Sequence, residues 1–189
     1  NPLAFDPKAL TRVFRLSGSD FFAEVLMPPL AERLASDAPK ASVSLVDLLP
    51  SNYISNLERN EVDLVLIPRM EMAEWVEMES VYRSGFVTIA RRGHPRLNQA
   101  GIAPGGRLPL DLFCDLKHVL FSTEGRPSAG GDVALAKIGR KRHVAMTLPV
   151  FGAVCRAVAE SDLIALVPTQ MALKLSGVLG LAIYRQPMP

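Results

Sequence analysis

Three turns of this chain each follow a segment with the residue pattern of a strand, and two of them carry short polar side chains. The turns cover residues 17–20, 122–128 and 148–151, which read SGSD, STEGRPS and LPVF. In an open α/β sheet, ligands bind at the carboxyl ends of strands, where the next helices begin. Free N–H groups at a helix start and the hydroxyls beside them favour an anion, often a carboxylate. The turns therefore predict a binding site for a small anionic molecule.

Aromatic and cationic side chains near these turns are the candidates to complete such a site. Phe21, Phe86 and Phe151 can supply flat apolar walls. Arg69, just past an apolar strand, and Arg126, inside the second turn, are the cations placed to meet a carboxylate.

Each candidate also has a purely structural interpretation, and the sequence leaves both open. Ser19 and Asp20 fit equally well as helix caps. The phenylalanines fit a hydrophobic core, and the arginines fit solvated loops. What favours the binding site is that turns of the same kind recur along the chain.

The sequence contains no motif for catalysis, a metal or a cofactor. The histidines at 94, 118 and 143 lie far apart, and none has a Cys, Asp or Glu at ligand spacing. There is no P-loop, no G-x-G-x-x-G after a strand and no G-x-S-x-G elbow. Cys114 and Cys155 fit reduced thiols better than a disulfide framework. We therefore expect neither an enzyme nor a bound cofactor.

Composition and charge indicate a globular α/β protein without a nucleic-acid-binding surface of its own. Of 189 residues 49% are hydrophobic, and the formal net charge is +2. Domains that bind DNA usually show a stronger positive bias. No secretory leader and no apolar stretch of membrane-spanning length is visible, which favours the cytoplasm. A start at Asn1 rather than Met suggests a piece of a longer protein.

Apolar periodicity predicts strands that alternate with helices, the order typical of an α/β fold with parallel sheets. Strands are expected over 11–16, 41–46, 63–67, 81–91, 118–122, 143–148, 163–167 and 181–184, and helices over 21–36, 51–60, 132–138, 150–160 and 169–175. Pro28 and Pro29 should kink or restart the first helix. Residues 63–67 are nearly all aliphatic and predict a strand covered on both faces.

A Gly/Pro-rich stretch over 98–109 divides the strands into two groups. It predicts two lobes, one formed by residues 1–88 with 168–189 and the other by 89–167. Extended crossover segments near 86–91 and 166–169 would join them.

Several short motifs, in order along the chain, resemble the effector-binding region of LysR-type transcription regulators. The resemblance is to the branch that regulates aromatic-acid catabolism and nodulation. The motifs read FDP at 5–7, FRL at 14–16, MPPL at 27–30, NEVDL at 60–64, RRGHP at 91–95, IGR at 138–140, LPVF at 148–151 and SDLIA at 161–165.

The resemblance implies a periplasmic-binding-protein-like fold of type 2, with two Rossmann-like lobes around a pocket for a small aromatic or carboxylate effector. By position, the family's pocket falls on Ser19, Asp20, Phe21, Pro68, Thr123, Ser128, Val150 and Phe151. Some members of the branch have histidines where this chain has Ser128 and Val150, so an imidazole that could hold a carboxylate is missing.

The resemblance also implies the partners. They are a small-molecule effector, further copies in a homodimer or homotetramer, and promoter DNA reached only through an N-terminal winged helix-turn-helix domain absent before Asn1. The family's closing segment is likewise absent after Pro189. Residues 21–34 and 150–160 are the expected self-association helices. The alternatives are a solute-binding protein of a transport system, which shares this fold, and an enzyme on a similar two-lobed fold.

Overall fold

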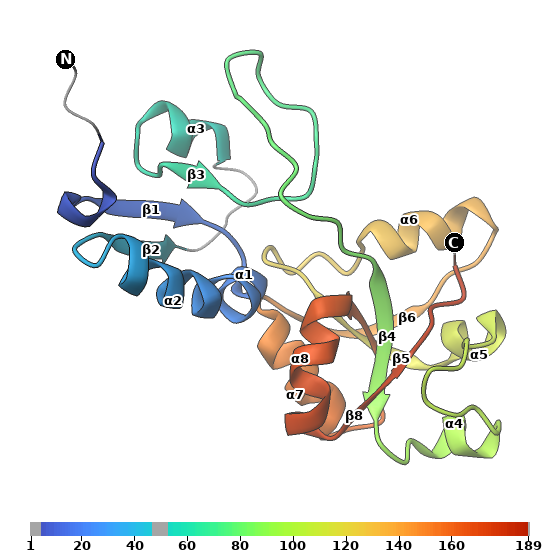
Figure 1. Ribbon diagram of the computed structural model, residues 1–189. Helices are drawn as coiled ribbons and strands as arrows, with labels where there is room; N and C mark the ends of the chain where they lie inside the picture. Colours follow the sequence, from blue (N-terminus) through green and yellow to red (C-terminus); the bar gives the residue numbers. More distant parts are fainter. Residues whose placement is uncertain (1–4, 47–52, 189) are drawn as a thin grey trace. The chain divides into compact units, whose positions relative to one another are not determined.

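The computed structural model describes residues 5–46 and 53–188, and contacts divide the chain into two compact units, Asn1–Val81 and Tyr82–Pro189 (Figure 1). The elements of the first unit are η1 (Pro7–Ala9), β1 (Val13–Ser17), α1 (Asp20–Val25), α2 (Met27–Asp37), β2 (Ser42–Val46), α3 (Tyr53–Glu58) and β3 (Leu64–Val65). Those of the second are β4 (Phe86–Arg91), α4 (Pro95–Gln99), α5 (Leu110–Asp115), β5 (Lys117–Phe121), α6 (Gly130–Lys137), β6 (His143–Leu148), α7 (Phe151–Ala159), β7 (Ala165–Pro168), α8 (Thr169–Leu179) and β8 (Leu181–Tyr184). The mixed α/β class expected from the sequence is confirmed.

The first unit is built on a parallel sheet with the strand order β2-β1-β3. The expected restart at the proline pair is confirmed, because α1 gives way to α2 at Leu26 and the prolines stand in the first turn of α2. A first-turn proline costs no hydrogen bond, since its missing N–H would have no partner within the helix. The start of the expected helix over 51–60 lies outside the described residues.

Strand β3 is shorter and more exposed than its composition suggests. A strand over 63–67 covered on both faces was expected, but β3 has two residues, and 57% of Leu64 is exposed. That prediction is wrong, because β3 has β1 as its one neighbour in the described sheet. An apolar run alone does not distinguish a central strand from an edge strand.

The second unit joins an antiparallel sheet, β7-β4-β8, to the parallel pair β5-β6. A parallel bridge between His118 and Ile164 links them, with backbone hydrogen bonds of 3.0 Å from Val119 N–H to the Ile164 carbonyl and from Ile164 N–H to the Lys117 carbonyl. The expectation of parallel pairing throughout is therefore wrong for β4.

The position of residues 168–189 differs from the sequence expectation. They were expected with the first lobe, but the contacts group them with the second unit. Strand β8 pairs with β4 along its whole length, from Thr88 opposite Tyr184 to Arg91 opposite Leu181. This pairing holds β8 and the preceding helix α8 against β4, a strand far away in the sequence.

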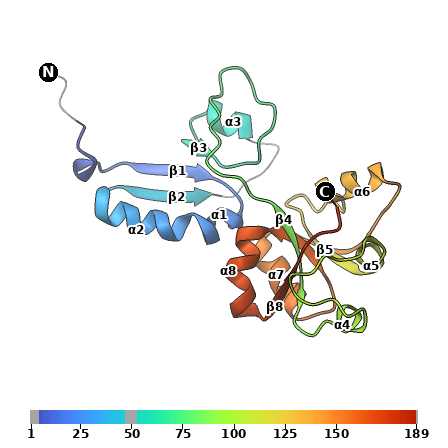
Figure 2. The same ribbon diagram turned by 45° about the vertical axis from the view of Figure 1, so that its right-hand side comes forward.

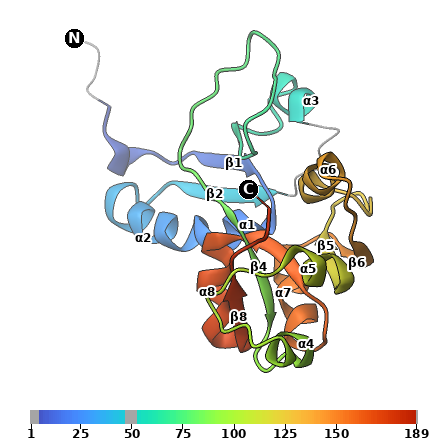
Figure 3. The same ribbon diagram turned by 90° about the vertical axis from the view of Figure 1, so that its right-hand side faces the viewer.

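Helices cover both faces of the second unit's sheet, with α7 and α8 on one side and α4, α5 and α6 on the other (Figures 1 and 2). Phe113, Leu135 and Ile164 anchor the core on the α4–α6 side. Figure 3 shows the second unit from a further side, with α7 and α8 again together. Helices α4 and α5 were not predicted, because each is short and lies within or beside the Gly/Pro-rich stretch.

Helix α7 turns its apolar side chains inward. Val154, Cys155 and Val158 are fully buried, and the helix contacts strands of both parts of the sheet. The proposed use of residues 150–160 as a self-association helix is therefore not supported by an exposed apolar face. None of the helices in the described part of the chain combines the length and apolarity that a bilayer span requires.

We predict that Leu135→Ala destabilises the chain by about 2–5 kcal/mol, because it leaves a cavity in the core. Val133→Ala is the matched control on the same helix, since Val133 is 57% exposed and Leu135 is 0% exposed. Val133→Ala should change the free energy of unfolding by less than about 1 kcal/mol. Denaturant unfolding followed by circular dichroism measures both, and equal losses would contradict the assignment of the core.

Candidate functional site

In the first unit, the candidate residues lie at the carboxyl edge of the parallel sheet. Strands β1, β2 and β3 end in register, with Ser17 opposite both Val46 and Val65. The turn that carries Ser19, Asp20 and Phe21 follows β1, and Pro68 and Arg69 follow β3. Parallel pairing therefore brings both groups to the same edge, as expected for a ligand site in an open α/β sheet.

Ser19 occupies the N-cap position of α1, but its side chain makes no capping hydrogen bond. Ser19 is half-buried, and no other partner of its hydroxyl is found among the described residues, so the hydroxyl can donate to a ligand. Phe21, in contrast, is buried and packs edge-on against Phe22 at a ring distance of 5.1 Å. At this position the core interpretation of the aromatic ring holds.

Gly18 is a residue whose contribution the sequence analysis missed. A Cβ atom at this position would lie 2.9 Å from the ring of Phe22 and 3.4 Å from side-chain carbons of Leu45 and Leu66. The lack of a side chain allows the turn to lie close against α1 and the sheet. A glycine between two serines after a strand was the available signal.

In the second unit, β5 and β6 also end in register, with Phe121 opposite Leu148. A backbone hydrogen bond of 2.9 Å from Ser122 N–H to the Leu148 carbonyl ties the two following turns together. The rings of Phe121 and Phe151 stack with centroids 3.9 Å apart and planes 7° from parallel. Phe121 was not among the predicted residues, although it stands two positions before Thr123.

The other candidates of this edge lie in the two turns. Thr123 is half-buried, and its hydroxyl has no hydrogen-bond partner among the described residues. Ser128 is exposed in the same loop, and Val150 is the N-cap residue of α7. Arg126 is largely exposed and pairs with the carboxylate of Glu124 at 2.8 Å, so its charge is already balanced.

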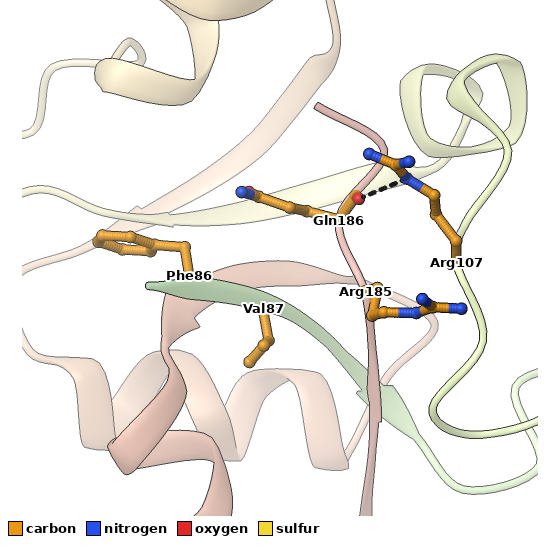
Figure 4. A pocket seen from close by; sticks show the side chains of 5 residues that line it. All are labelled: Phe86, Val87, Arg107, Arg185 and Gln186. Atoms are coloured by element: carbon orange, nitrogen blue, oxygen red, sulfur yellow. Dashed lines mark hydrogen bonds between the residues drawn. The ribbon is translucent and has the colours of Figure 1, made fainter. Parts of the chain in front are cut away.

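Phe86 lies elsewhere in the second unit, at the start of β4. Together with Val87, Arg107, Arg185 and Gln186 it lines a hollow of about 320 Å³ (Figure 4).

A buried ion pair supports the loop that carries Thr123, Arg126 and Ser128. Arg142, whose side chain is 1% exposed, donates two hydrogen bonds of 2.8 Å to the carboxylate of Asp132 in the first turn of α6. Asp132 also accepts a 2.8 Å hydrogen bond from the N–H of Ala129, the last residue before α6. This arrangement holds the end of the loop against the start of the helix. The sequence analysis did not identify it.

His118 completes this buried network. Its Nε2 donates to the carbonyl of Phe113 at 2.7 Å, and its Nδ1 lies 3.4 Å from a guanidinium nitrogen of Arg142. Burial lowers the pKa of His118, and the hydrogen bond to Phe113 opposes this effect only in part, leaving a pKa of about 4. Burial raises the pKa of Asp132, but hydrogen bonds from Arg142 and Ala129 outweigh it, so the pKa falls below its usual value.

Two α/β units, each with polar and aromatic side chains at the carboxyl edge of parallel strands, define a small-molecule-binding module. Among the described residues no cluster of His, Cys, Asp or Glu could hold a metal ion. A family model described as the LysR substrate binding domain matches residues 8–187. The chain belongs to this family.

The curated relatives are transcriptional regulators. The HTH-type transcriptional activator NagR of Ralstonia sp is 29% identical over 184 residues, which cover 97% of this chain and 59% of the relative. Nodulation protein D 1 of Rhizobium tropici is 28% identical over 187 residues, covering 98% and 58%. The chain thus spans a little under three fifths of their length. The expected branch of the family is confirmed, and an enzyme or a transport protein is not favoured.

Solved structures agree on the fold. The probable transcriptional regulator PA0477 of Pseudomonas aeruginosa matches 98% of this chain and 59% of its own, with a TM-score of 0.86 and 27% identity. The regulatory domain of MexT from the same organism matches 95% and 84%, with a TM-score of 0.79 and 29% identity. The effector binding domain of QuiR in complex with shikimate matches 94% and 81%, with a TM-score of 0.72 and 15% identity, and shows the fold alone. The periplasmic-binding-protein-like type 2 class is confirmed.

We predict that Asp132→Asn destabilises the chain by about 3 kcal/mol or more, because it leaves the charge of Arg142 buried without a partner. The control is Asp115→Asn, which breaks the exposed pair of Asp115 with Arg96 at 2.7 Å. An exposed pair contributes at most about 1 kcal/mol. Thermal unfolding of both variants gives the comparison, and similar losses would contradict a structural role of the buried pair.

Acid should weaken the fold through His118. Its pKa is about 4 when folded against an ordinary value of 6.5, so on acidification the unfolded chain takes up the proton first. The stability that His118 contributes is complete above about pH 6.5, and roughly 3 kcal/mol of it is lost as the pH falls to about 4. In His118→Gln this part of the pH dependence of the unfolding free energy should disappear. In His143→Gln, which changes an exposed histidine, it should remain.

Proposed function

We propose that this chain binds a small organic anion, with a carboxylate and an aromatic or other apolar part, as the effector of a LysR-type regulator. The ligand-binding residues are the candidates at the two strand edges. In the first unit Ser19 is the proposed hydroxyl donor to an anionic group. In the second unit Thr123 is the proposed donor, and Phe151, stacked on Phe121, is the proposed contact of the apolar part.

The observation that carries this proposal is the free hydroxyl at each edge. Ser19 and Thr123 follow β1 and β5, and each is a half-buried residue whose hydroxyl has no hydrogen-bond partner among the described residues. Neither hydroxyl is fully enclosed, so each is accessible to a ligand and can exchange a hydrogen bond to water for one to a charged group.

The cationic part of the site differs between the two units. Arg126 is paired with Glu124, so a ligand carboxylate would have to compete with that pair. Arg69 has no ion-pair partner among the described residues and is exposed beside Pro68. We therefore assign the charge contact in the first unit to Arg69. Asp20 in the same unit and Ser128 in the second unit are further polar candidates of the proposal. Val150 remains an apolar candidate of the same proposal, whereas Phe86 lies apart from the two strand edges, at the start of β4.

Control of transcription is proposed for the whole protein to which this sequence belongs. NagR is named a transcriptional activator, and the chain matches 59% of its length. In this proposal the effector changes promoter binding, which is performed by a winged helix-turn-helix domain. The proposed setting is the bacterial cytoplasm, where the promoter DNA lies, and the proposed assembly is a homodimer or homotetramer.

Ligand binding is tested by calorimetric titration of the chain with a panel of aromatic and aliphatic carboxylic acids. For any acid that binds, Ser19→Ala and Thr123→Val should each weaken binding by about 1.5–3 kcal/mol, because each removes a hydrogen bond to a charged group. This corresponds to roughly ten- to a hundred-fold in affinity. The melting temperature without ligand should stay unchanged.

Ser42→Ala and Thr11→Val are the matched controls. Ser42 is exposed at the amino end of the same sheet, paired with Val13, and Thr11 is exposed before β1. Both controls should bind normally. Normal binding by Ser19→Ala and Thr123→Val would place the ligand elsewhere, and a loss of stability instead of affinity would identify the two residues as structural.

A further inference from the structure

The hollow beside Phe86 lies wholly within the second unit, apart from the three turns, and has the features of an anion site. Its lining consists of Phe86, Val87, Arg107, Arg185 and Gln186, and its volume is about 320 Å³ (Figure 4). No part of the proposed effector function uses its two arginines.

The backbone fixes the two arginines next to each other. Arg107 and Arg185 form a parallel β-bridge. The N–H of Arg185 donates to the carbonyl of Gly106 at 2.8 Å, and the N–H of Leu108 donates to the carbonyl of Arg185 at 3.1 Å. These bonds join the 105–108 stretch to the residues just after β8, so the backbone keeps the two arginine residues side by side.

Hydrogen bonds hold the guanidinium groups of both arginines in position, but no carboxylate of the described residues neutralises their charge. The Nε of Arg107 donates to the carbonyl of Gln186 at 3.3 Å, and the Nε of Arg185 donates to the carbonyl of Gly105 at 3.2 Å. Within residues 5–46 and 53–188 neither arginine forms an ion pair with a carboxylate. Like charges at opposed positions of paired strands destabilise each other, and a bound anion would relieve that repulsion.

The hollow changes from cationic to apolar along its length. In Figure 4 the arginines lie at one end, and the side chain of Gln186 extends from there toward Phe86. Phe86 is 47% exposed, so its ring is open to contact. A ligand that fits this order has an oxyanion at one end and a flat apolar body at the other, because a guanidinium fork matches carboxylate or phosphate and a ring packs on a ring.

We propose that the Arg107–Arg185 hollow binds small aryl oxyanions at a site separate from the effector site at the strand edges. Arg107 and Arg185 hold the oxyanion, Gln186 donates its amide hydrogens, and Phe86 with Val87 contacts the ring. The proposal does not depend on the proposed function.

The test uses the whole chain in calorimetric titrations with phenyl phosphate and benzoate, which distinguish the two oxyanions. Inorganic phosphate provides the charge without the ring, and phenol the ring without the charge. Phenyl phosphate should bind at least tenfold more tightly than inorganic phosphate, which shares its head group, or benzoate at least tenfold more tightly than phenol, which shares its ring. Equal affinities for all four compounds, or no binding by either aryl anion, would overturn the proposal.

Substitutions locate the site. Arg107→Gln and Arg185→Gln should each weaken aryl-anion binding at least tenfold, whereas Arg92→Gln, which removes an exposed arginine outside the hollow, should not. Equal losses in all three variants would indicate general charge attraction and contradict a site. The double variant Ser19→Ala with Thr123→Val should keep its affinity. If it loses affinity while both arginine variants bind normally, the anion occupies the effector site and only the present inference fails.

Gln186→Glu separates binding from folding. A carboxylate here would neutralise the two arginines from within the chain and repel an incoming anion. Aryl-anion binding should therefore be lost while the melting temperature stays equal or rises. Retained binding, or a lower melting temperature, would show that the arginines do not form an unneutralised anion site.

Discussion

Strand β5 is the constraint on which the second unit depends. It pairs with β6 on one side and, through the bridge of His118 with Ile164, reaches the segment that leads into β7 on the other. Val119 and Leu120 are buried between these neighbours. These contacts fix the position of the carboxyl end of β5 and therefore the start of the loop that follows it. The stacked rings of Phe121 and Phe151 follow from this pairing, because the register brings the ends of β5 and β6 together.

Electrostatics holds the other end of the same loop. Arg142 and Asp132 form a pair that water hardly reaches, and burial makes its loss far more costly than that of the exposed pairs around it. His118 can lie beside Arg142 only as a neutral imidazole, because a proton on Nδ1 would face the positively charged guanidinium and be repelled by it. The loop over 122–129 is thus anchored by backbone pairing at its start and by an ion pair at its end, and between these anchors Arg126 is paired with Glu124. Anchored loops of this kind are typical of binding sites carried by rigid scaffolds.

Sequence periodicity predicted the elements best where the strand is bordered by clear turns. The bounds of β6 and β8 are those expected, and the proline pair restarts the first helix as expected. Periodicity failed where the answer depended on neighbours. The aliphatic run around β3 indicated a central strand, but an edge strand with Leu64 exposed results. The direction of β4 and the unit to which β8 belongs were equally hidden, because strand pairing joins residues distant in the chain and local pattern carries no record of the partner.

By itself the sequence determined the α/β class, the family and the turns that carry Ser19, Thr123 and Phe151, because these depend on local patterns and on motifs in order along the chain. Only the tertiary structure decided which side chains meet. It stacks Phe121 on Phe151, pairs Arg126 with Glu124, buries Arg142 against Asp132 and sets Arg107 beside Arg185. Contact between side chains depends on strand register and helix packing, which arise from many weak interactions summed over the whole unit. The residue type determines which interactions a side chain can make, and the fold determines whether another residue of the chain already makes them.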